Sequence, residues 1–166
     1  MTGSAGSPGH CCSACFPLTE VRIRGPHAHA YLIGAGPDGG LLDVTAVSRT
    51  WAWAAGGMIS TAADLTRFYR ALFGGRLLAP SLLREMLTTV PIEPGFRYGL
   101  SITTLELPCG TVVGHDGGDA GTQTWALTTP DLRDQVIMMV NAQDDATVQG
   151  LVLERVARAF CAIRPA

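Results

Sequence analysis

Apolar residues recur at intervals of three and four over residues 61–87, and this spacing predicts two helices. The first is expected to begin at Thr61, where Thr61 and Asp64 resemble a capping box, and to end at Gly74-Gly75. Its apolar face consists of Leu65, Phe68, Tyr69, Leu72 and Phe73. The second helix begins with Pro80 and is expected to bury Leu82, Leu83, Met86 and Leu87.

Beyond Pro94 apolar and polar residues alternate, a period that predicts strands. Four strands are expected, over residues 98–105, 111–115, 123–129 and 135–141, and the short turns between them imply antiparallel neighbours. Residues 136–140 are apolar without alternation, so this strand is expected at the centre of the sheet, covered on both faces. A last helix over 146–163 follows. The predicted fold class is α+β, with helices packed on an antiparallel sheet.

The first 17 residues are rich in Gly, Ser, Pro and Cys and have no periodicity, so a disordered, Cys-rich tail over 1–17 and one domain over 18–166 are expected. His10, Cys11, Cys12 and Cys15 could begin a soft-metal site, but the second half of a four-ligand set is not apparent. His27 and His29 alternate as on one face of a strand, and we favour a surface or substrate-side pair. No metal and no cofactor are predicted.

Composition narrows the functional classes. The chain of 166 residues is 47% apolar with a net charge of −2, and its Arg residues are scattered, so neither nucleic acid nor an anionic membrane is an expected partner. No apolar stretch approaches the ~20 residues that cross a bilayer. The N-terminus as written has no signal-peptide pattern, which makes a cytoplasmic location the default. All 12 basic residues are Arg, so no Lys can act as Schiff base, general base or phosphate ligand.

Two motifs carry candidate chemistry. Residues 53–65, Trp-Ala-Ala-Gly-Gly-Met-Ile-Ser-Thr-Ala-Ala-Asp-Leu, join a glycine turn to the capped helix. Residues 114–118, Gly-His-Asp-Gly-Gly, are expected to end a strand and to open a glycine-rich loop. Because His and Asp are acid–base groups and glycines admit a close backbone, residues 114–118 are the predicted functional centre.

The run from Trp51 to Asn141 resembles the C-terminal portion of the serine β-lactamase and D-Ala-D-Ala carboxypeptidase family, of the class C and actinomycete DD-peptidase type. The first motif, followed by Arg67-Phe68, and the Gly-His-x-Gly-Gly strand end carry the resemblance, and residues 24–45 are similar to the loop that precedes them. The resemblance implies a β-lactamase/transpeptidase-like fold and a serine hydrolase site. One wall of that site would consist of His115, Asp116, Gly117 and Gly118, with the Gly118 N–H as an oxyanion-hole donor.

The departures from the family pattern concern the catalytic groups. Without Lys, the Ser-x-x-Lys motif that supplies the family's nucleophile and base is absent, and no Tyr-x-Asn occurs. Asp116 replaces the Thr whose hydroxyl would bind a substrate carboxylate, and its charge would repel that group. The resemblance therefore implies esters or amides without the carboxylate as substrates.

The resemblance also implies what surrounds the site. The N-terminal strands and the nucleophile helix of the family would precede Leu18, so the chain is interpreted as a truncated copy whose sheet has an unpaired edge available for association. Cys109 and Cys161 are the best disulfide pair by this comparison, and in secreted relatives such a bridge would hold the last helix on the sheet. A cytosolic chain would keep both reduced.

Three functions remain open. The first is a truncated hydrolase homologue that performs no acyl-enzyme hydrolysis on its own. The second is a repurposed or split serine hydrolase (esterase, amidase or peptidase) acting on a small-molecule or peptide substrate. It would use a partner chain, or His115 as base oriented by Asp116 with Ser60, Ser101 or Thr122 as nucleophile, although adjacent strand residues point to opposite faces. The third is a non-enzymatic binding module that uses the exposed sheet edge.

Overall fold

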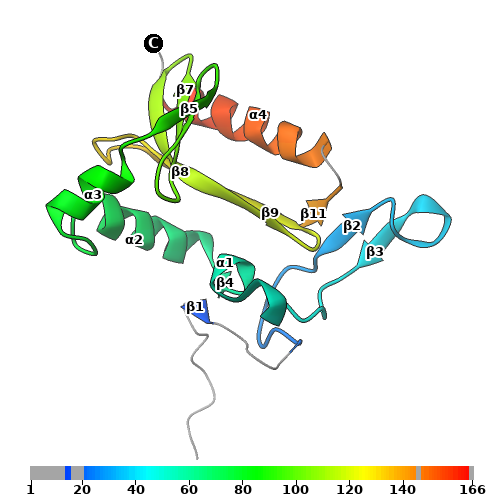
Figure 1. The fold of residues 1–166 in the computed structure, drawn as a ribbon. Coiled ribbons are helices and arrows are strands. Elements are labelled where there is room, and N and C mark those ends of the chain that lie inside the picture. The colour runs from blue at the N-terminus through cyan, green and yellow to red at the C-terminus, as the bar shows by residue number, and fades with distance from the viewer. Residues whose placement is uncertain (1–13, 16–20, 145–146, 165–166) are drawn as a thin grey trace, which may run out of the picture.

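The computed structural model describes residues 14–15, 21–144 and 147–164, and its centre is an antiparallel sheet of six strands (Figure 1). Their order across the sheet is β10-β9-β8-β7-β6-β5. In chain order they are β5 (Val90–Glu93), β6 (Phe96–Tyr98), β7 (Thr103–Leu107), β8 (Gly110–Asp119), β9 (Thr122–Thr128) and β10 (Gln135–Val140). Consecutive strands are neighbours, so short turns build the whole sheet, as the α+β prediction requires.

Helices cover both faces of this sheet, α2 (Ala62–Phe73) on one and α4 (Thr147–Ala162) on the other (Figure 1). Successive strand residues face opposite sides, so Val112 packs with the α4 cluster and Val113 with the α2 cluster. The α4 cluster is the larger, and its fully buried members are Val112, Leu127, Val156 and Phe160.

The first predicted helix is confirmed in its start and its end. The Thr61 hydroxyl accepts a hydrogen bond from the Asp64 backbone N–H at 3.1 Å, and Gly74 is the C-terminal cap of α2. The second helix, α3 (Pro80–Met86), begins as expected, but its predicted burial is wrong: Leu82 and Leu87 are 52% and 37% exposed, and Leu83 and Met86 are only partly buried. Only the side that carries Met86 contacts the α2 cluster, because α3 lies beyond the end of α2.

A smaller sheet extends from the site end of the molecule as an arm (Figure 1). It contains β11 (Ala142–Gln143), β2 (Tyr31–Ile33) and β3 (Leu41–Asp43), with the 3-10 helix η1 (Pro37–Gly39) between the last two. The Tyr31 N–H donates to the carbonyls of Gly121 and Asn141, at 3.2 and 3.1 Å. Gly121 has a φ of +82°, and a Cβ there would lie 2.5 Å from the Tyr31 nitrogen, so the junction requires glycine.

The remaining elements join the arm to α2. They are η2 (Thr50–Ala52), α1 (Trp53–Gly56) and β4 (Ile59–Ser60), and β4 pairs with β1 (Ala14–Cys15). Two residues of the segment expected to be a tail therefore lie in a strand, while the remainder of 1–17, including His10, Cys11 and Cys12, lies outside the described residues. In the described part of the chain no helix is long and apolar enough to cross a membrane.

Two strand predictions need correction. The strand expected over 98–105 is two strands, β6 and β7, because the chain reverses where Gly99 N–H donates to the Ile102 carbonyl at 2.7 Å and Ser101 takes a φ of 58°. The last strand, β10, was expected at the centre and is an edge strand. Its apolar residues do not alternate because α2 and α4 cover its two faces, as predicted, and not because strands flank it.

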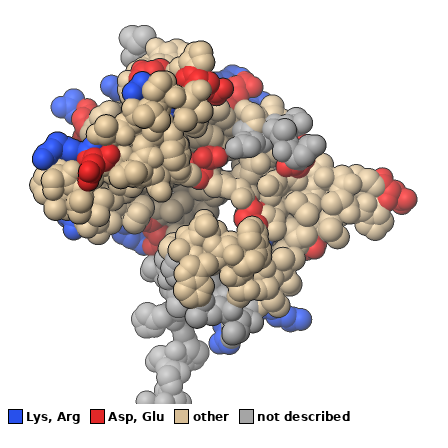
Figure 2. Space-filling model, viewed as in Figure 1, with Lys and Arg blue, Asp and Glu red and all other residues tan. Residues whose placement is uncertain are grey.

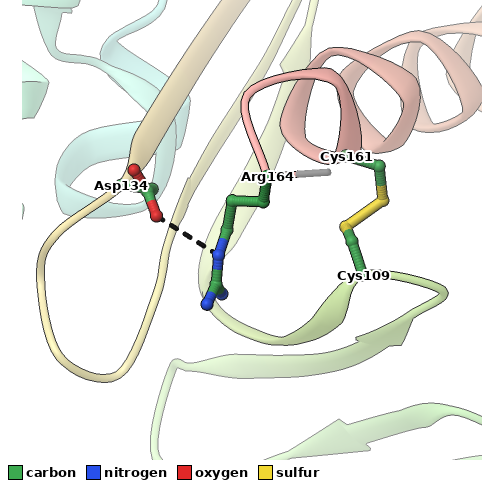
Figure 3. The surroundings of a disulfide bond; sticks show 4 residues. All are labelled: Cys109, Asp134, Cys161 and Arg164. Carbon is green, nitrogen blue, oxygen red and sulfur yellow. Dashed lines mark ion pairs between the residues drawn. A yellow bond between two sulfur atoms is a disulfide. The ribbon is translucent and has the colours of Figure 1, made fainter. Parts of the chain in front are cut away.

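A disulfide joins Cys109 to Cys161, as the family resemblance implied, and ties the β7–β8 turn to the end of α4 (Figure 3). The residues are separated by 52 positions in the chain. Beside the bridge Arg164 makes an ion pair with Asp134 at 3.3 Å, so the last turn of the chain is also held to the β9–β10 connection. Both links lie at the end of the sheet away from the arm (Figures 1 and 3).

Candidate functional site

The Gly114–Gly118 segment lies inside strand β8, so the expectation of a glycine-rich loop is wrong. Register with β9 continues from Val113↔Thr128 to Asp119↔Thr122, and the chain reverses only at Ala120-Gly121. Gly114 is required by close approach, because a Cβ there would lie 1.8 Å from the Ala126 carbonyl oxygen. Glycines disfavour strands in general, but here the β9 ladder fixes the segment as extended.

Strand β8 is paired on both sides only at Val113 and Gly114, where its two ladders overlap. The ladder with β7 runs from Leu107↔Gly110 to Thr103↔Gly114 and ends there. Among the described residues, positions 115–119 therefore pair with β9 alone, and no strand lies along their other edge, the kind of edge to which an extended ligand can add. Every predicted site residue lies on this half-paired segment.

His115 is fixed from two sides. Its Nε2 lies 2.8 Å from the Tyr98 hydroxyl, with the rings edge to face at a centroid distance of 5.6 Å. Its Nδ1 is hydrogen-bonded to the backbone oxygen of Asp116 and lies 3.7 Å from the Asp116 carboxylate. Adjacent strand residues were expected to keep the His and Asp side chains apart, and at 3.7 Å the imidazole and the carboxylate are indeed too far apart for a hydrogen bond. They are near enough to interact electrostatically.

Tyr98 is the site residue that the sequence did not indicate. It comes from β6, and the register Tyr98↔Thr103↔Gly114 carries it across β7 to the end of the β8 ladder. Since β6 and β7 were predicted as one strand, this register could not be derived from the sequence.

The three hydroxyls considered as nucleophiles do not contact His115 in the described structure. Both imidazole nitrogens are already engaged, and Thr122 donates its hydroxyl to the Asp119 carbonyl at 2.8 Å. Ser101 is exposed on the β6–β7 turn, and Ser60 lies in β4 on the wall of a separate cavity. A base–nucleophile pair built on His115 is therefore not assembled by the described residues.

Two cavities flank the second half of β8. The larger, of about 400 Å³, lies between β4, the arm and the ends of β9 and β10, and Arg49 pairs with Asp119 at 3.2 Å on its wall. Figure 2 shows a hollow between the main body and the arm, with acidic side chains at its margin. The smaller pocket, of about 150 Å³, is lined by Asp116, Gly117, Gly118, Gln123, Trp125 and Gln143. The site end of the sheet is thus open where the opposite end is packed.

Comparisons with known proteins agree with this architecture. The family model described as beta-lactamase matches residues 18–159. This chain belongs to the β-lactamase family. The match covers both motifs and the whole six-stranded sheet, so the fold implied by the resemblance is confirmed.

Solved structures that resemble this chain include two amide hydrolases and a penicillin binding protein. A D-stereospecific amidohydrolase from Streptomyces sp. is 36% identical with a TM-score of 0.76, over 90% of this chain and 44% of that one. A D-amino acid amidase from Ochrobactrum anthropi SV3, complexed with L-phenylalanine amide, is 25% identical with a TM-score of 0.78, over 92% and 46%. A penicillin binding protein from Bacillus halodurans shares the fold at 19% identity and a TM-score of 0.59, over 80% and 40%. This chain therefore spans less than half the length of these proteins.

The pKa values of one residue beside the sheet and one residue on the arm are shifted from their ordinary values. Burial raises the pKa of Tyr69, on α2, to about 12, and the negative charge of Asp116 adds to that rise. On the arm, hydrogen bonds from the Thr45 hydroxyl and from His29 lower the pKa of the Asp43 carboxyl to about 2. His29 Nδ1 lies 2.7 Å from the Asp43 carboxylate, and the His29 ring stacks on His27 at a centroid distance of 6.0 Å.

Over the described ranges no three His, Cys, Asp or Glu side chains gather as a metal site would require.

Proposed function

We propose that this chain forms the sheet-side wall of a serine hydrolase site of the amidase type, acts on amides of amino acids, and performs no acyl-enzyme hydrolysis on its own. The half-paired segment 115–119 carries the proposal, because it presents the backbone of an edge strand beside a fixed imidazole. The structural neighbours that hydrolyse amides support the reaction class.

The chain's own residues have defined roles in this proposal. The free edge of β8 pairs with the extended backbone of the substrate and aligns its scissile amide. The Gly118 N–H donates to the oxyanion that develops on the amide carbonyl. His115 is hydrogen-bonded to the Tyr98 hydroxyl, and this pair relays a proton to the reacting groups from the sheet side through that hydroxyl.

The nucleophile and its base are assigned to a second polypeptide segment. The 166 residues contain no Lys, so a Ser-x-x-Lys pair cannot come from them. The amide-hydrolysing neighbours are more than twice as long as the matched region, and their unmatched part is the natural source of those groups. Position 116 also restricts the substrate, because the negative charge of Asp116 disfavours substrates that end in a carboxylate.

Complementation tests the proposal. The part of the Streptomyces amidohydrolase that this chain does not match would be co-expressed with this chain, and D-phenylalanine amide hydrolysis measured. We expect turnover by the co-purified pair and none by either component. His115→Ala should lower kcat by about 100-fold or more, whereas Arg158→Ala, at an exposed position of α4, should leave it unchanged.

Two outcomes would contradict the proposal. One is a stable complex that shows no turnover. The other is hydrolysis, or labelling by a fluorophosphonate probe, of this chain alone. Labelling of Ser60, Ser101 or Thr122 would favour a nucleophile within the chain.

A further inference from the structure

The small pocket on the α4 side of β8 has the composition of a cation site. It is lined by one acidic residue, Asp116, by Gln123, Gln143 and Trp125, and by the two glycines Gly117 and Gly118. Asp116 and Trp125 are paired across β8 and β9, and Gly118 and Gln123 are the next pair on the same face. Because Gly118 has no side chain, the space between Asp116 and Gln123 stays open.

Gln123 gives an independent indication of a ligand. The residue is only 5% exposed, and its side-chain oxygen has no hydrogen-bond partner in the described structure. A buried acceptor without a donor is unfavourable, so a donor that enters the pocket is favoured. The side-chain oxygen of Gln143 already accepts the Gly121 N–H at 3.0 Å, so its NH₂ group is the donor on the opposite wall.

We propose that the Asp116–Gln123 end of this pocket binds the α-ammonium group of an amino-acid amide substrate. The proposal rests on the proposed function for the substrate class and adds how that substrate is recognised. An ammonium group supplies three N–H donors and one positive charge, which match a carboxylate and an unpartnered carbonyl oxygen. The ammonium group fits a pocket of about 150 Å³, which is too small to hold an aromatic side chain at the same time.

The orientation that follows places the reacting amide at the free edge. The pocket opens beside Gly117 and Gly118, which belong to the half-paired segment of β8. A substrate whose ammonium group contacts Asp116 therefore has its amide carbonyl next to the β8 backbone. The Gln143 NH₂, on the Gly118 side, can donate to that carbonyl and does not compete for the cation. Asp116 is on this basis a specificity residue for α-amino amides.

Binding to the chain alone tests the inference without any catalysis. Backbone amide NMR would be followed during titration with D-phenylalanine amide and with 3-phenylpropanamide, which lacks only the amino group. We expect saturable shifts at Gly117, Gly118 and the Gln123 side chain with the first ligand, and binding at least about five-fold weaker with the second.

Matched variants locate the effect. Asp116→Asn keeps the shape and removes the charge, and should weaken D-phenylalanine amide about five-fold or more without changing 3-phenylpropanamide. Asp38→Asn removes the same charge from the exposed tip of the arm and should change neither. Gly118→Ala fills the pocket, since its Cβ would meet only ordinary contacts at 3.7 Å or more, and should abolish binding while the spectrum stays folded.

Three results would overturn the inference: equal affinity for the two ligands, equal effects of Asp116→Asn and Asp38→Asn, or no saturable shift up to about 50 mM ligand. Failure of the complementation assay leaves this measurement intact, so the two proposals can fail separately. Ammonium binding without hydrolysis in the complex would retain the pocket and reject the catalytic role.

Discussion

The two halves of strand β8 share one backbone but differ in what surrounds them. Residues 110–114 pair with β7, residues 113 and 114 pair with β9 as well, and this half contributes Val112 and Val113 to the two core clusters and adjoins the Cys109–Cys161 bridge. Residues 115–119 pair with β9 alone and lie between two cavities. The first half is packed between strands and core clusters, whereas the second has a strand on one side only and borders the cavities. Stability and function are thus separated along a single strand.

Substitution of glycine on either side of this boundary should give the largest contrast. Gly114→Ala would place its Cβ 1.8 Å from the Ala126 carbonyl oxygen, so β8 and β9 must separate. We expect a loss of about 3 kcal/mol in the free energy of unfolding, measured by urea denaturation. Gly117→Ala, whose Cβ has nothing within 4 Å, should stay within about 1 kcal/mol of the parent. Equal losses would show that the two halves are equally constrained.

The sequence predicted the local features of the fold but not the length of β8. The start and end of α2 follow from Thr61, Asp64 and Gly74, because a cap and a helical period are local features. The β7–β8 and β8–β9 neighbours follow from short turns. The length of β8 does not, because its glycines indicate a loop locally and only the β9 partner makes them a strand.

Within the site, the sequence predicted the residues but not their relations. His115 and Asp116 stand out because of their motif, and the family match supports their place in the fold. The Tyr98 contact depends on the register of two ladders, and the ammonium pocket depends on Gln123 and Gln143, which come from different strands. Such contacts depend on how the strands pair in the folded protein, and the residue pattern of a single segment does not predict that pairing.

Removal of the disulfide should affect the paired half more than the open half. Replacement of Cys109 and Cys161 by Ala releases a link between positions 52 residues apart, and should lower the free energy of unfolding by about 2–4 kcal/mol. Hydrogen exchange should accelerate over 110–114 and in α4, with little change over 115–119. Reductant should reproduce this effect in the parent and add nothing in the variant. A parent insensitive to reductant would mean that packing alone holds α4.

The smallest expected effect lies on the arm that adjoins the open half. The pKa of Asp43 is lowered to about 2, so its hydrogen bonds stabilise the folded arm above the ordinary carboxyl pKa of 3.8. This contribution should be lost as the pH falls from about 4 towards 2, because protonation removes the charge that Thr45 and His29 contact.

Asp43→Asn should therefore lower the thermal midpoint slightly at neutral pH and flatten its decline between about pH 4 and 2, as measured by circular dichroism. Asp38→Asn, which replaces an exposed carboxylate on the same arm, should keep the decline of the parent. If the two variants decline in parallel, general charge on the arm governs the acid response and the Asp43 contacts do not. If only Asp43→Asn flattens it, the acid response comes from this specific cluster, which joins the end of β3 to the segment that precedes β2.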